Sequence, residues 1–521
     1  MKNNGWIGNF SYFRTRINGE SEAVYDLDNN VHYSYNDLED RANRLANYLK
    51  ENQNINKGDR VAFISRNRIE MIDAYYATAK LGAIFIPYNA RLSSEEFIKL
   101  INSETPKILF YEGDFKDTVD QFRNKVSIEK YIILNDEDSI DCDDTPYREV
   151  ISFENNSMVY CSELELDDIH LIIHTGGTTG LPKGGMVSHQ SLMFNSFNEI
   201  CTWGLNYTDS AFIILPMYHT GGWNLLTLPL LHCGGRIIIN KQFDPKLTLN
   251  VVEKEKTTLL FGAATMFRMM SDLPEFEKTD LSSLKWVMAG AAPTPINIME
   301  RFWNKGLKFV LGYGMTEAGP NNLSSTPQFM SDKLIRDKYA SVGKPMYMTM
   351  TRVVNDEGDD VKVNETGELL WSGPQIFSGY WNNETETNST IVDGWIYTGD
   401  MATIDEDGYY YIVGRKKNMF ISGGENVFPP EVESAIYEIP QIHEVCVFGV
   451  PDEKWGEVGK AVISLKPGSD LTKEEIQKIL KKKIAGYKIP KYIQFIDDIP
   501  KNNVGKIVVS KIMEMYGKSE D

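Results

Sequence analysis

Apolar positions along the chain follow two alternating patterns. Short apolar runs at residues 61–64 and 83–87 indicate buried strands, and the segment between them places Ile69, Ile72 and Tyr75 on one helical face. The same unit recurs, with strands expected at 257–261, 284–288 and 308–311 and helices expected from 266 onward and at 296–304. Strands that alternate with helices predict mostly parallel sheets covered by helices on both faces.

The pattern changes after Gly414. Beyond it the sequence predicts a helix at 431–437, strands at 444–450 and 461–465, a charged helix at 473–484 and a last strand at 492–496. We therefore expect an α/β fold with two parts. A large N-terminal domain of mostly parallel sheets covered by helices spans residues 1–414, and a small α+β domain spans residues 415–521.

Charge is distributed unevenly between these two parts. The chain of 521 residues carries 54 Lys and Arg against 73 Asp and Glu, a net charge of −19. From Arg415 onward 17 basic residues face 16 acidic ones, so nearly all the acidity lies in the large part. An acidic protein binds nucleic acid or an anionic membrane poorly without a dedicated site. Any polyanionic ligand must therefore be held by a local basic or amide-rich site.

Cysteines and long apolar stretches add two exclusions. The five cysteines are widely spaced and form no CxxC pair, which is typical of reduced thiols and not of a disulfide framework or a zinc site. The most apolar long stretch, residues 225–239, is interrupted by polar residues and is shorter than the ~20 residues that span a bilayer. We expect a soluble, cytoplasmic protein with no membrane span.

The strongest chemical feature is the sequence His-Thr-Gly-Gly-Thr-Thr-Gly-Leu-Pro-Lys-Gly at residues 174–184, directly after an apolar strand at 169–173. Its glycines and threonines offer backbone amides and hydroxyls around a small concavity, and Lys183 adds a cation, which together suit a polyphosphate. The GxxxxGK[ST] spacing of a P-loop is absent. Taken alone, the segment could equally be a flexible glycine turn.

Three weaker motifs follow. Residues 312–319, Gly-Tyr-Gly-Met-Thr-Glu-Ala-Gly, come after an expected strand, where α/β sheets bind ligands. The tyrosine could stack on a nucleobase, and Glu317 could hold Mg²⁺ with hard carboxylate oxygens. Residues 397–400, Tyr-Thr-Gly-Asp, and 414–418, Gly-Arg-Lys-Lys-Asn, offer an acid for ribose hydroxyls and cations for a nucleotide. Each is also compatible with a buried tyrosine, a helix start or a solvated turn.

In this order the motifs resemble the adenylate-forming superfamily, which contains acyl-CoA synthetases, aryl-CoA ligases, firefly luciferase and nonribosomal-peptide adenylation domains. Residues 33–38, 81–87 and 503–507 extend the resemblance over nearly the whole chain. The resemblance implies a large N-terminal domain joined by a hinge to a small mobile lid. It also implies ATP, Mg²⁺ and CoA as cofactors, and activation of a carboxylic acid as an acyl-AMP before transfer to a thiol.

The resemblance also assigns roles to single residues. Lys506 is expected to bridge the attacking carboxylate and the α-phosphate, with Thr178, Glu317 and His219 completing the catalytic set. Glu317 is expected to hold magnesium, and Gly424 to lie beside the pantetheine tunnel. The hinge is expected at Lys417. The resemblance assigns to ATP Thr175, Gly176, Gly177, Thr178, Thr179, Gly180, Lys183, Gly312, Tyr313, Gly314, Met315, Thr316, Asp400, Arg415 and Lys506.

Two departures from the family pattern concern the phosphate loop and the C-terminus. The loop reads Thr-Gly-Gly at 175–177, where many members have Thr-Ser-Gly, and residues 500–506 lack the common Thr and Ser before Gly-Lys. Lys506 itself is in place, so we expect activity. A carboxylate is already ionised at neutral pH, since its unperturbed pKa lies near ~4. The reaction therefore needs positioning and charge neutralisation and no general base.

The acid site is expected in residues 215–223, Leu-Pro-Met-Tyr-His-Thr-Gly-Gly-Trp, which resemble the acid-binding region of acyl- and aryl-CoA ligases. No aspartate stands there to pair with an ammonium, so an amino-acid substrate is not expected. Trp223 either gates the acyl group, as in some fatty-acid ligases, or packs in the core. The residues expected to contact the acid are His219, Trp223, Gly290, Ala291 and Ala292.

The sequence therefore predicts an acid–CoA ligase for an apolar acid, with fatty or branched acids ahead of aryl acids. One alternative is loading of the acyl group onto a carrier protein. A different class is a non-catalytic nucleotide-binding sensor on the same fold. We expect no nucleic-acid partner, and a monomer or a homodimer.

Overall fold

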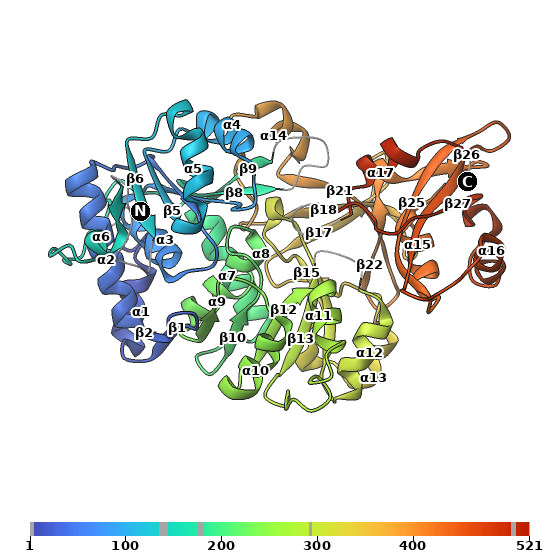
Figure 1. Ribbon diagram of the computed structural model, residues 1–521, viewed down its shortest axis with the longest axis horizontal. Helices are drawn as coiled ribbons and strands as arrows, with labels where there is room; N and C mark the ends of the chain where they lie inside the picture. The colour runs from blue at the N-terminus through green and yellow to red at the C-terminus, as the bar shows by residue number, and fades with distance from the viewer. Residues whose placement is uncertain (1–4, 135–143, 176–181, 291–293, 502–506, 520–521) are drawn as a thin grey trace.

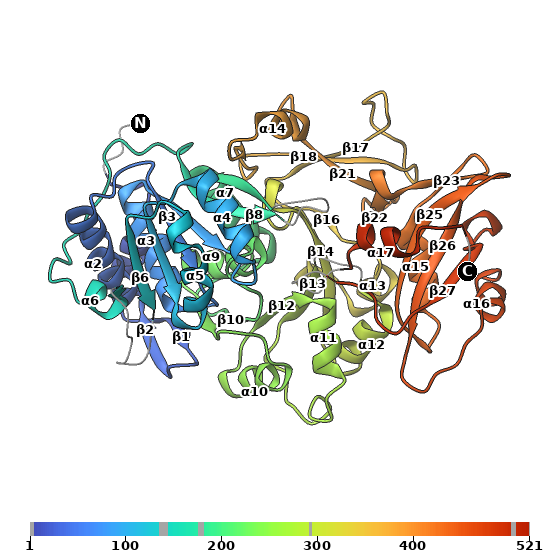
Figure 2. The same cartoon turned by 45° about the horizontal axis from the view of Figure 1, so that its top comes forward.

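The computed structural model describes residues 5–134, 144–175, 182–290, 294–501 and 507–519 (Figure 1). The N-terminal part forms two large sheets and a smaller third sheet, and the C-terminal part lies to one side of them (Figures 1 and 2). The helices are α1 (Phe10–Asn18), α2 (Tyr35–Gln53), α3 (Ile69–Leu81), α4 (Ser94–Glu104), α5 (Lys116–Phe122), α6 (Tyr147–Ile151), α7 (His189–Trp203), α8 (Thr220–Asn224), α9 (Thr227–Cys233), α10 (Pro245–Glu255), α11 (Ala264–Ser271), α12 (Ile296–Asn304), α13 (Asp332–Asp337), α14 (Glu384–Thr390), α15 (Pro429–Tyr437), α16 (Lys473–Leu480) and α17 (Val509–Tyr516).

The first sheet has nine strands, and the six at its centre run parallel. In spatial order its strands are β16 (Lys344–Pro345), β15 (Leu323–Ser324), β14 (Phe309–Tyr313), β13 (Trp286–Gly290), β12 (Leu259–Ala263), β10 (Ser210–Ile213), β11 (Arg236–Ile239), β1 (Glu22–Asp26) and β2 (Val31–Ser34). Three of the expected strand-and-helix units fall here, at β12, β13 and β14. The parallel sheet predicted from those units is confirmed.

The second sheet has eight strands and is also mainly parallel. Its order is β19 (Gly379–Tyr380), β9 (Lys183–Ser188), β8 (Ile169–Thr175), β4 (Ile84–Tyr88), β3 (Arg60–Ile64), β5 (Ile108–Glu112), β6 (Lys130–Leu134) and β7 (Thr145–Pro146). The strands β8, β9 and β19 run antiparallel to one another at one end of the sheet. This end carries the residues of the predicted phosphate loop.

Helices fill the space between the two large sheets and cover their outer faces. Helix α3 is buried along its whole length, from Ile69 to Leu81, and contributes to one core that also contains residues of both sheets. The outer face of the second sheet packs against α4 and α5, where Phe97 and Phe122 are fully buried. The packing explains why the strands β3 and β4 read as continuous apolar runs, since both of their faces are covered.

The third sheet differs from the sequence prediction. Residues 350–415 form an antiparallel sheet of β17 (Met350–Val354), β18 (Gly367–Ser372), β21 (Trp395–Ile404) and β20 (Ile391–Val392), with β22 (Tyr410–Arg415) pairing to β21. Strands β20 and β21 are joined by Asp393 and Gly394, both at positive φ, which is the two-residue turn typical of a hairpin. A connection this short cannot cross over to a parallel neighbour, so the strand must turn back.

The C-terminal part is a separate α+β unit, as the sequence predicts. Its sheet consists of β24 (Glu425–Val427), β23 (Phe420–Ser422), β26 (Gly456–Leu465), β25 (Ile442–Asp452) and β27 (Tyr492–Phe495). Helices α15 and α16 cover one face of the sheet and α17 covers the other. Helix α16 ends at Leu480, four residues before the predicted end of that helix. In the part of the chain that the structure describes, no helix is long and apolar enough to cross a membrane.

Candidate functional site

The predicted phosphate loop connects β8 to β9. Thr175 and Lys183 are register partners at the end of this hairpin where the loop begins, so both ends of the loop are held at neighbouring positions. Five of the residues predicted to bind ATP lie between them and fall outside the described residues: Gly176, Gly177, Thr178, Thr179 and Gly180. Their roles therefore stay predictions, and the structure places only the two strand ends that the loop connects.

Lys183 has a partner that the sequence did not suggest. Its ammonium forms an ion pair with the carboxylate of Glu386, in the first turn of α14. The same ammonium lies 5.2 Å from the centre of the Tyr380 ring, within the range of a cation–π contact. Lys183 is thus paired with a carboxylate 203 residues away in the chain.

Glu317 lies close to this lysine and shares a partner with it. The Tyr380 hydroxyl donates a hydrogen bond of 2.6 Å to Glu317 Oε1, and both groups are buried. Burial raises the pKa of Glu317 above its ordinary value, although the Tyr380 hydroxyl acts in the opposite direction. Thr316, the preceding residue, has its methyl group 3.8 Å from the position that a Cβ at Gly185 of β9 would occupy. The segment after β14 therefore lies directly against the phosphate hairpin.

A magnesium ion is compatible with this donor set. Mg²⁺ commonly uses one or two carboxylates and takes its remaining ligands from substrate phosphates and water. Glu317 supplies one buried carboxylate beside the phosphate hairpin. Among the described residues no group of three or more His, Cys, Asp or Glu side chains could hold a metal ion by itself. The arrangement suits an ion that arrives with a polyphosphate better than a permanently bound metal.

A second group of residues at the end of β14 is joined through the carboxylate of Asp400. The Tyr313 hydroxyl donates a hydrogen bond of 2.6 Å to Asp400 Oδ2, and Arg415 Nε lies 2.6 Å from Asp400 Oδ1. Asp400 and Arg415 are register partners in β21 and β22, and Arg415 also donates to the backbone oxygen of Thr398 at 3.0 Å. The structure therefore brings together three residues that the sequence placed in three separate motifs.

The neighbouring strand ends supply an apolar wall. Gly290 ends β13 beside β14, and a Cβ at Gly290 would lie 3.3 Å from the backbone oxygen of Gly312 and 2.9 Å from the Phe261 ring. A larger residue at position 290 would displace that ring. Gly314 and Met315 follow directly after β14. Ala291 and Ala292, also predicted to contact the acid, lie outside the described residues.

His219 lies at the start of α8 with its ring buried. Its Nε2 has no hydrogen-bond partner among the described residues. Burial lowers the pKa of His219 to about 4, and the nearby charges of Arg91 and His174 act in the same direction. This histidine is therefore neutral at pH 7.

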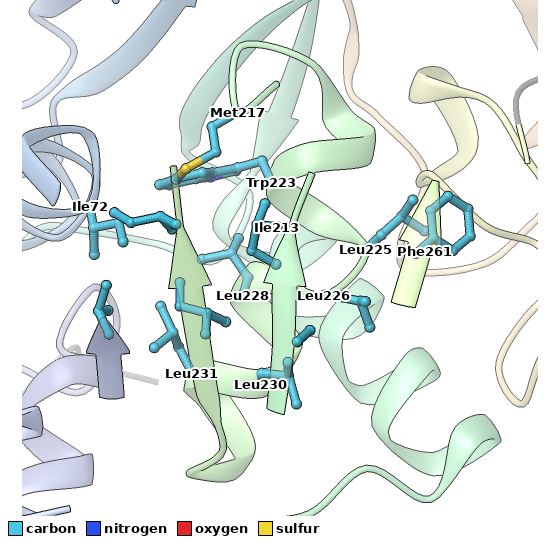
Figure 3. Close-up of a cluster of buried hydrophobic side chains, with 14 of the residues drawn as sticks. Ile72, Ile213, Met217, Trp223, Leu225, Leu226, Leu228, Leu230, Leu231 and Phe261 are labelled. Carbon is cyan, nitrogen blue, oxygen red and sulfur yellow. The ribbon is translucent and has the colours of Figure 1, made fainter. Parts of the chain in front are cut away.

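Trp223 ends up in the hydrophobic core. It is 0% exposed, and its ring lies 4.9 Å from Tyr75 and 5.9 Å from Phe85. Figure 3 shows it next to Met217, within a cluster of aliphatic side chains. This environment corresponds to the packing alternative left open by the sequence. A gating role for the tryptophan stays a prediction.

Two of the residues predicted for the lid, Lys417 and Gly424, lie near the junction of the two parts of the chain. Lys417 is in a short 3-10 helix, Lys416–Asn418, which separates β22 from β23. Gly424 is at φ +90°, and no atom lies within 4 Å of the position where its Cβ would be. It lines a cavity of about 630 Å³ together with residues 354–357 of the large part and Glu431 and Lys488 of the small part. Lys506 falls outside the described residues.

Three residues in contact with the site had no signal in the sequence. Tyr380 donates a hydrogen bond to Glu317, which is 63 residues away in the sequence. Glu386 forms the ion pair with Lys183. Glu104 forms a hydrogen bond with His174, which is 70 residues away in the sequence. None belongs to a motif, and each contact joins segments far apart along the chain. Only the tertiary fold reveals them.

Comparisons with known proteins identify the family of the chain. The family model described as AMP-binding enzyme matches residues 14–381, and the model of the AMP-binding enzyme C-terminal domain matches residues 431–506. A feruloyl-CoA synthase from an Amycolatopsis species is 34% identical over 517 residues, which cover 99% of this chain and 100% of the relative. A long-chain-fatty-acid–CoA ligase from Bacillus subtilis is 32% identical, and the alignment covers 92% of this chain and 90% of the relative.

A solved structure has the same overall fold. The crystal structure of ATP-bound MatB from Rhodopseudomonas palustris has a TM-score of 0.88 and 27% sequence identity, covering 98% of this chain and 99% of that one. The fold, the order of the motifs and the full-length similarity lead to one conclusion. The chain belongs to the family of AMP-binding enzymes, and the adenylate-forming acid–CoA ligases are its relatives within that family.

Proposed function

We propose that this AMP-forming acid–CoA ligase activates an apolar carboxylic acid of compact, aryl-like size. The observation that carries the proposal is the apolar wall at the ends of β12 and β13. There the Phe261 ring lies over Gly290, and Leu225 of the segment after α8 faces the same ring (Figure 3). The similarity to a feruloyl-CoA synthase supports an aromatic acid.

Packing around Trp223 supports a compact acid over a long chain. The indole is fully buried against Tyr75 and Phe85, and we infer that it closes the space behind α8 to a long acyl chain. Opening that direction would require moving an aromatic cluster in a close-packed interior, where even small volume changes are costly. The sequence predicts fatty or branched acids ahead of aryl acids, whereas the burial of Trp223 supports the opposite order.

The proposed first half-reaction needs no general base. The substrate carboxylate is already ionised at neutral pH. We assign the ribose hydroxyls to Asp400 and Arg415, adenine to Tyr313, and the phosphates to the hairpin of Thr175 and Lys183. Magnesium, when bound, would be held by Glu317 and would neutralise charge on the phosphates. Lys506 would join the carboxylate to the α-phosphate, a positioning and charge-stabilising role.

The second half-reaction requires the thiol of CoA to reach the acyl-AMP. We propose that the lid, residues 415–521, turns about Lys417 and thereby exchanges Lys506 for the segment around Gly424. The position of Gly424 in a cavity between the two parts supports this route, because a pantetheine arm needs an open channel beside a residue without a side chain. The thiol then attacks the acyl carbonyl, and AMP leaves.

A panel of acids tests the proposal. The protein is incubated with ATP, Mg²⁺ and, in turn, cinnamic, phenylacetic and benzoic acids or fatty acids of eight to sixteen carbons, and pyrophosphate release is measured. Transfer to CoA is then scored as thioester. The proposal expects the aryl acids to give the highest kcat/KM. A maximum at sixteen carbons would refute the compact pocket, and thioester formation only with a carrier protein would refute CoA as acceptor.

A further inference from the structure

His174, the residue before the phosphate loop, makes a contact that the roles above do not use. It is the next-to-last residue of β8, and its Nε2 lies 2.8 Å from Glu104 Oε1. Both residues are buried, at 5% and 2% exposure. A carboxylate oxygen only accepts hydrogen bonds, so the imidazole Nε2 is the donor. A hydrogen bond to a charged acceptor in a dry environment is among the stronger contacts a protein can make.

Glu104 is held rigidly from its own side. It is the last residue of α4, a helix that starts with a reciprocal capping box between Ser93 and Glu96. The helix ends at Thr105, which is at φ +47° and donates its backbone N–H to the oxygen of Ile101. Arg60 Nε donates to the backbone oxygen of Glu104 at 2.8 Å. The carboxylate is therefore attached to a helix end that is fixed at both backbone and cap.

The phosphate hairpin is shaped to admit this carboxylate. The register partner of His174 in β9 is Gly184, and a Cβ at Gly184 would lie 2.8 Å from Glu104 Oε1. That distance is shorter than real Cβ contacts, so an alanine there would push the carboxylate away from the histidine. The glycine allows Glu104 to pass over β9 and reach β8. The hairpin and the helix end are complementary at this point.

His174 also lies between the two halves of the proposed site. On one side it leads directly into Thr175 and the phosphate loop. On the other side it is close enough to His219 to influence that histidine electrostatically. Its ring lies 5.3 Å from the ring of Tyr88, at the end of the parallel neighbour β4. Its Nδ1 has no partner among the described residues.

From these contacts we propose that Glu104 and His174 are positioning residues for the adenylation step. The hydrogen bond between them fixes the end of β8 to α4 and thereby holds Thr175, and its register partner Lys183, in place before ATP arrives. Binding groups that are already in position lose less conformational entropy when the ligand binds. The inference rests on the proposed acid–CoA ligase function.

Two substitutions at position 174 distinguish the effect of the hydrogen bond to Glu104, here called the anchor, from the effect of the imidazole ring itself. In His174→Gln the side-chain amide reaches about as far as Nε2 and can still donate to Glu104. In His174→Asn the amide stops near the position of Nδ1 and cannot reach. We expect His174→Asn to raise the KM for ATP and to slow acyl-AMP formation, about ten- to a hundred-fold overall, because small misplacements of binding groups are costly. His174→Gln is expected to stay within about three-fold of the wild type for both quantities.

Glutamate 104 provides the reciprocal test. Glu104→Gln keeps an oxygen that accepts from Nε2, whereas Glu104→Ala removes it and should reproduce His174→Asn. Glu39→Gln is the matched control, since Glu39 is also a buried carboxylate, bonded to Lys80 Nζ at 2.9 Å, but lies outside the site. We expect Glu39→Gln to lower the melting temperature and to leave the KM for ATP unchanged.

The readouts are pyrophosphate release at varied ATP, thioester formation from supplied acyl-AMP, the ATP dissociation constant by calorimetry, and the melting temperature. The anchor predicts weaker ATP binding and slower adenylation in His174→Asn, with thioester formation from acyl-AMP unchanged. Equal losses in both half-reactions, equal impairment of His174→Gln and His174→Asn, or a wild-type ATP affinity in His174→Asn would each overturn it. If the wild type itself released no pyrophosphate with any acid, the proposed function would fail, while calorimetry would still test the anchor.

Discussion

The ion pair between Lys183 and Glu386 makes a quantitative prediction about ATP binding. For Lys183 to contact the phosphates, its ammonium must first leave the Glu386 carboxylate. The free energy of that pair is then subtracted from the binding energy of ATP. Substitution of Glu386 by Gln removes the competitor and keeps the size of the side chain, so we expect the variant to bind ATP more tightly than the wild type.

The solvent exposure of Lys183 and Glu386 determines how large the change in ATP affinity should be. The two side chains are 34% and 43% exposed, so water and salt screen the pair strongly. Pairs of this kind contribute about 0.5–1 kcal/mol, which corresponds to a two- to five-fold change in affinity. Glu386 also repels the negatively charged phosphates, so its replacement by Gln is expected to strengthen ATP binding for this second reason. We therefore expect the KM for ATP to fall about two- to five-fold in Glu386→Gln, with a smaller change at high ionic strength.

The assay is acid-dependent pyrophosphate release at saturating acid, with ATP varied at low and high salt. Glu384→Gln is the matched control, because Glu384 lies in the same turn of α14 and has no ion pair in the described part of the chain. AMP supplies a second control. It lacks the β- and γ-phosphates, so its affinity should not change if Lys183 contacts those groups. A higher KM for ATP in Glu386→Gln would refute the reasoning, since Glu386 would then orient Lys183 and not compete for it.

The remaining predictions concern the hinge, the catalytic lysine and acid stability. Lys417→Pro, which fixes φ near −65°, should slow thioester formation more than acyl-AMP formation, and equal losses would remove the hinge assignment. Lys506→Ala should slow adenylation about 10²–10³-fold while supplied acyl-AMP is still converted to thioester, and normal adenylation in this variant would contradict the role. Burial lowers the pKa of His232 to about 4. Below pH ~6.5 this histidine is therefore protonated in the unfolded chain but stays neutral in the folded chain until the pH approaches 4. Stability therefore falls as pH drops from 6.5 toward 4, and His232→Gln should reduce the loss between pH 7 and pH 5 by about 2 kcal/mol, measured by denaturant unfolding. If His232→Gln loses as much unfolding free energy between pH 7 and pH 5 as the wild type, other titrating groups determine the acid sensitivity.

Local patterns in the sequence predict much of the fold, because they reflect burial on one or both faces. The strand at β3 and the helix α12 are where the apolar periodicity places them. The antiparallel sheet of residues 350–415 was not predicted. Its strands are defined by turn geometry, as at Asp393 and Gly394, and the parallel pattern upstream gives no warning of the change.

The candidate site divides in the same way. Motifs identify the residues at strand ends, such as Tyr313 and Thr175, because glycines and polar side chains interrupt apolar runs there. The partners of those residues cannot be read from the sequence. Glu386 and Glu104 are ordinary helical glutamates, with no local feature that marks them. Their importance comes only from the sheet order, which brings α14 and the end of α4 to the hairpin.

A two-residue strand connects these partners and makes the phosphate and metal sites depend on each other. Tyr380 of β19 is the register partner of Gly185 in β9, its hydroxyl bonds Glu317, and its ring faces Lys183. The next residue, Trp381, donates its backbone N–H to Gly184 and its indole N–H to Ser103, at the end of α4. A displacement of β19 would therefore move the proposed magnesium ligand, the phosphate lysine and the helix that carries Glu104 together. Because one short strand touches all three, changes in ATP affinity and in magnesium dependence should appear together in any variant that disturbs it.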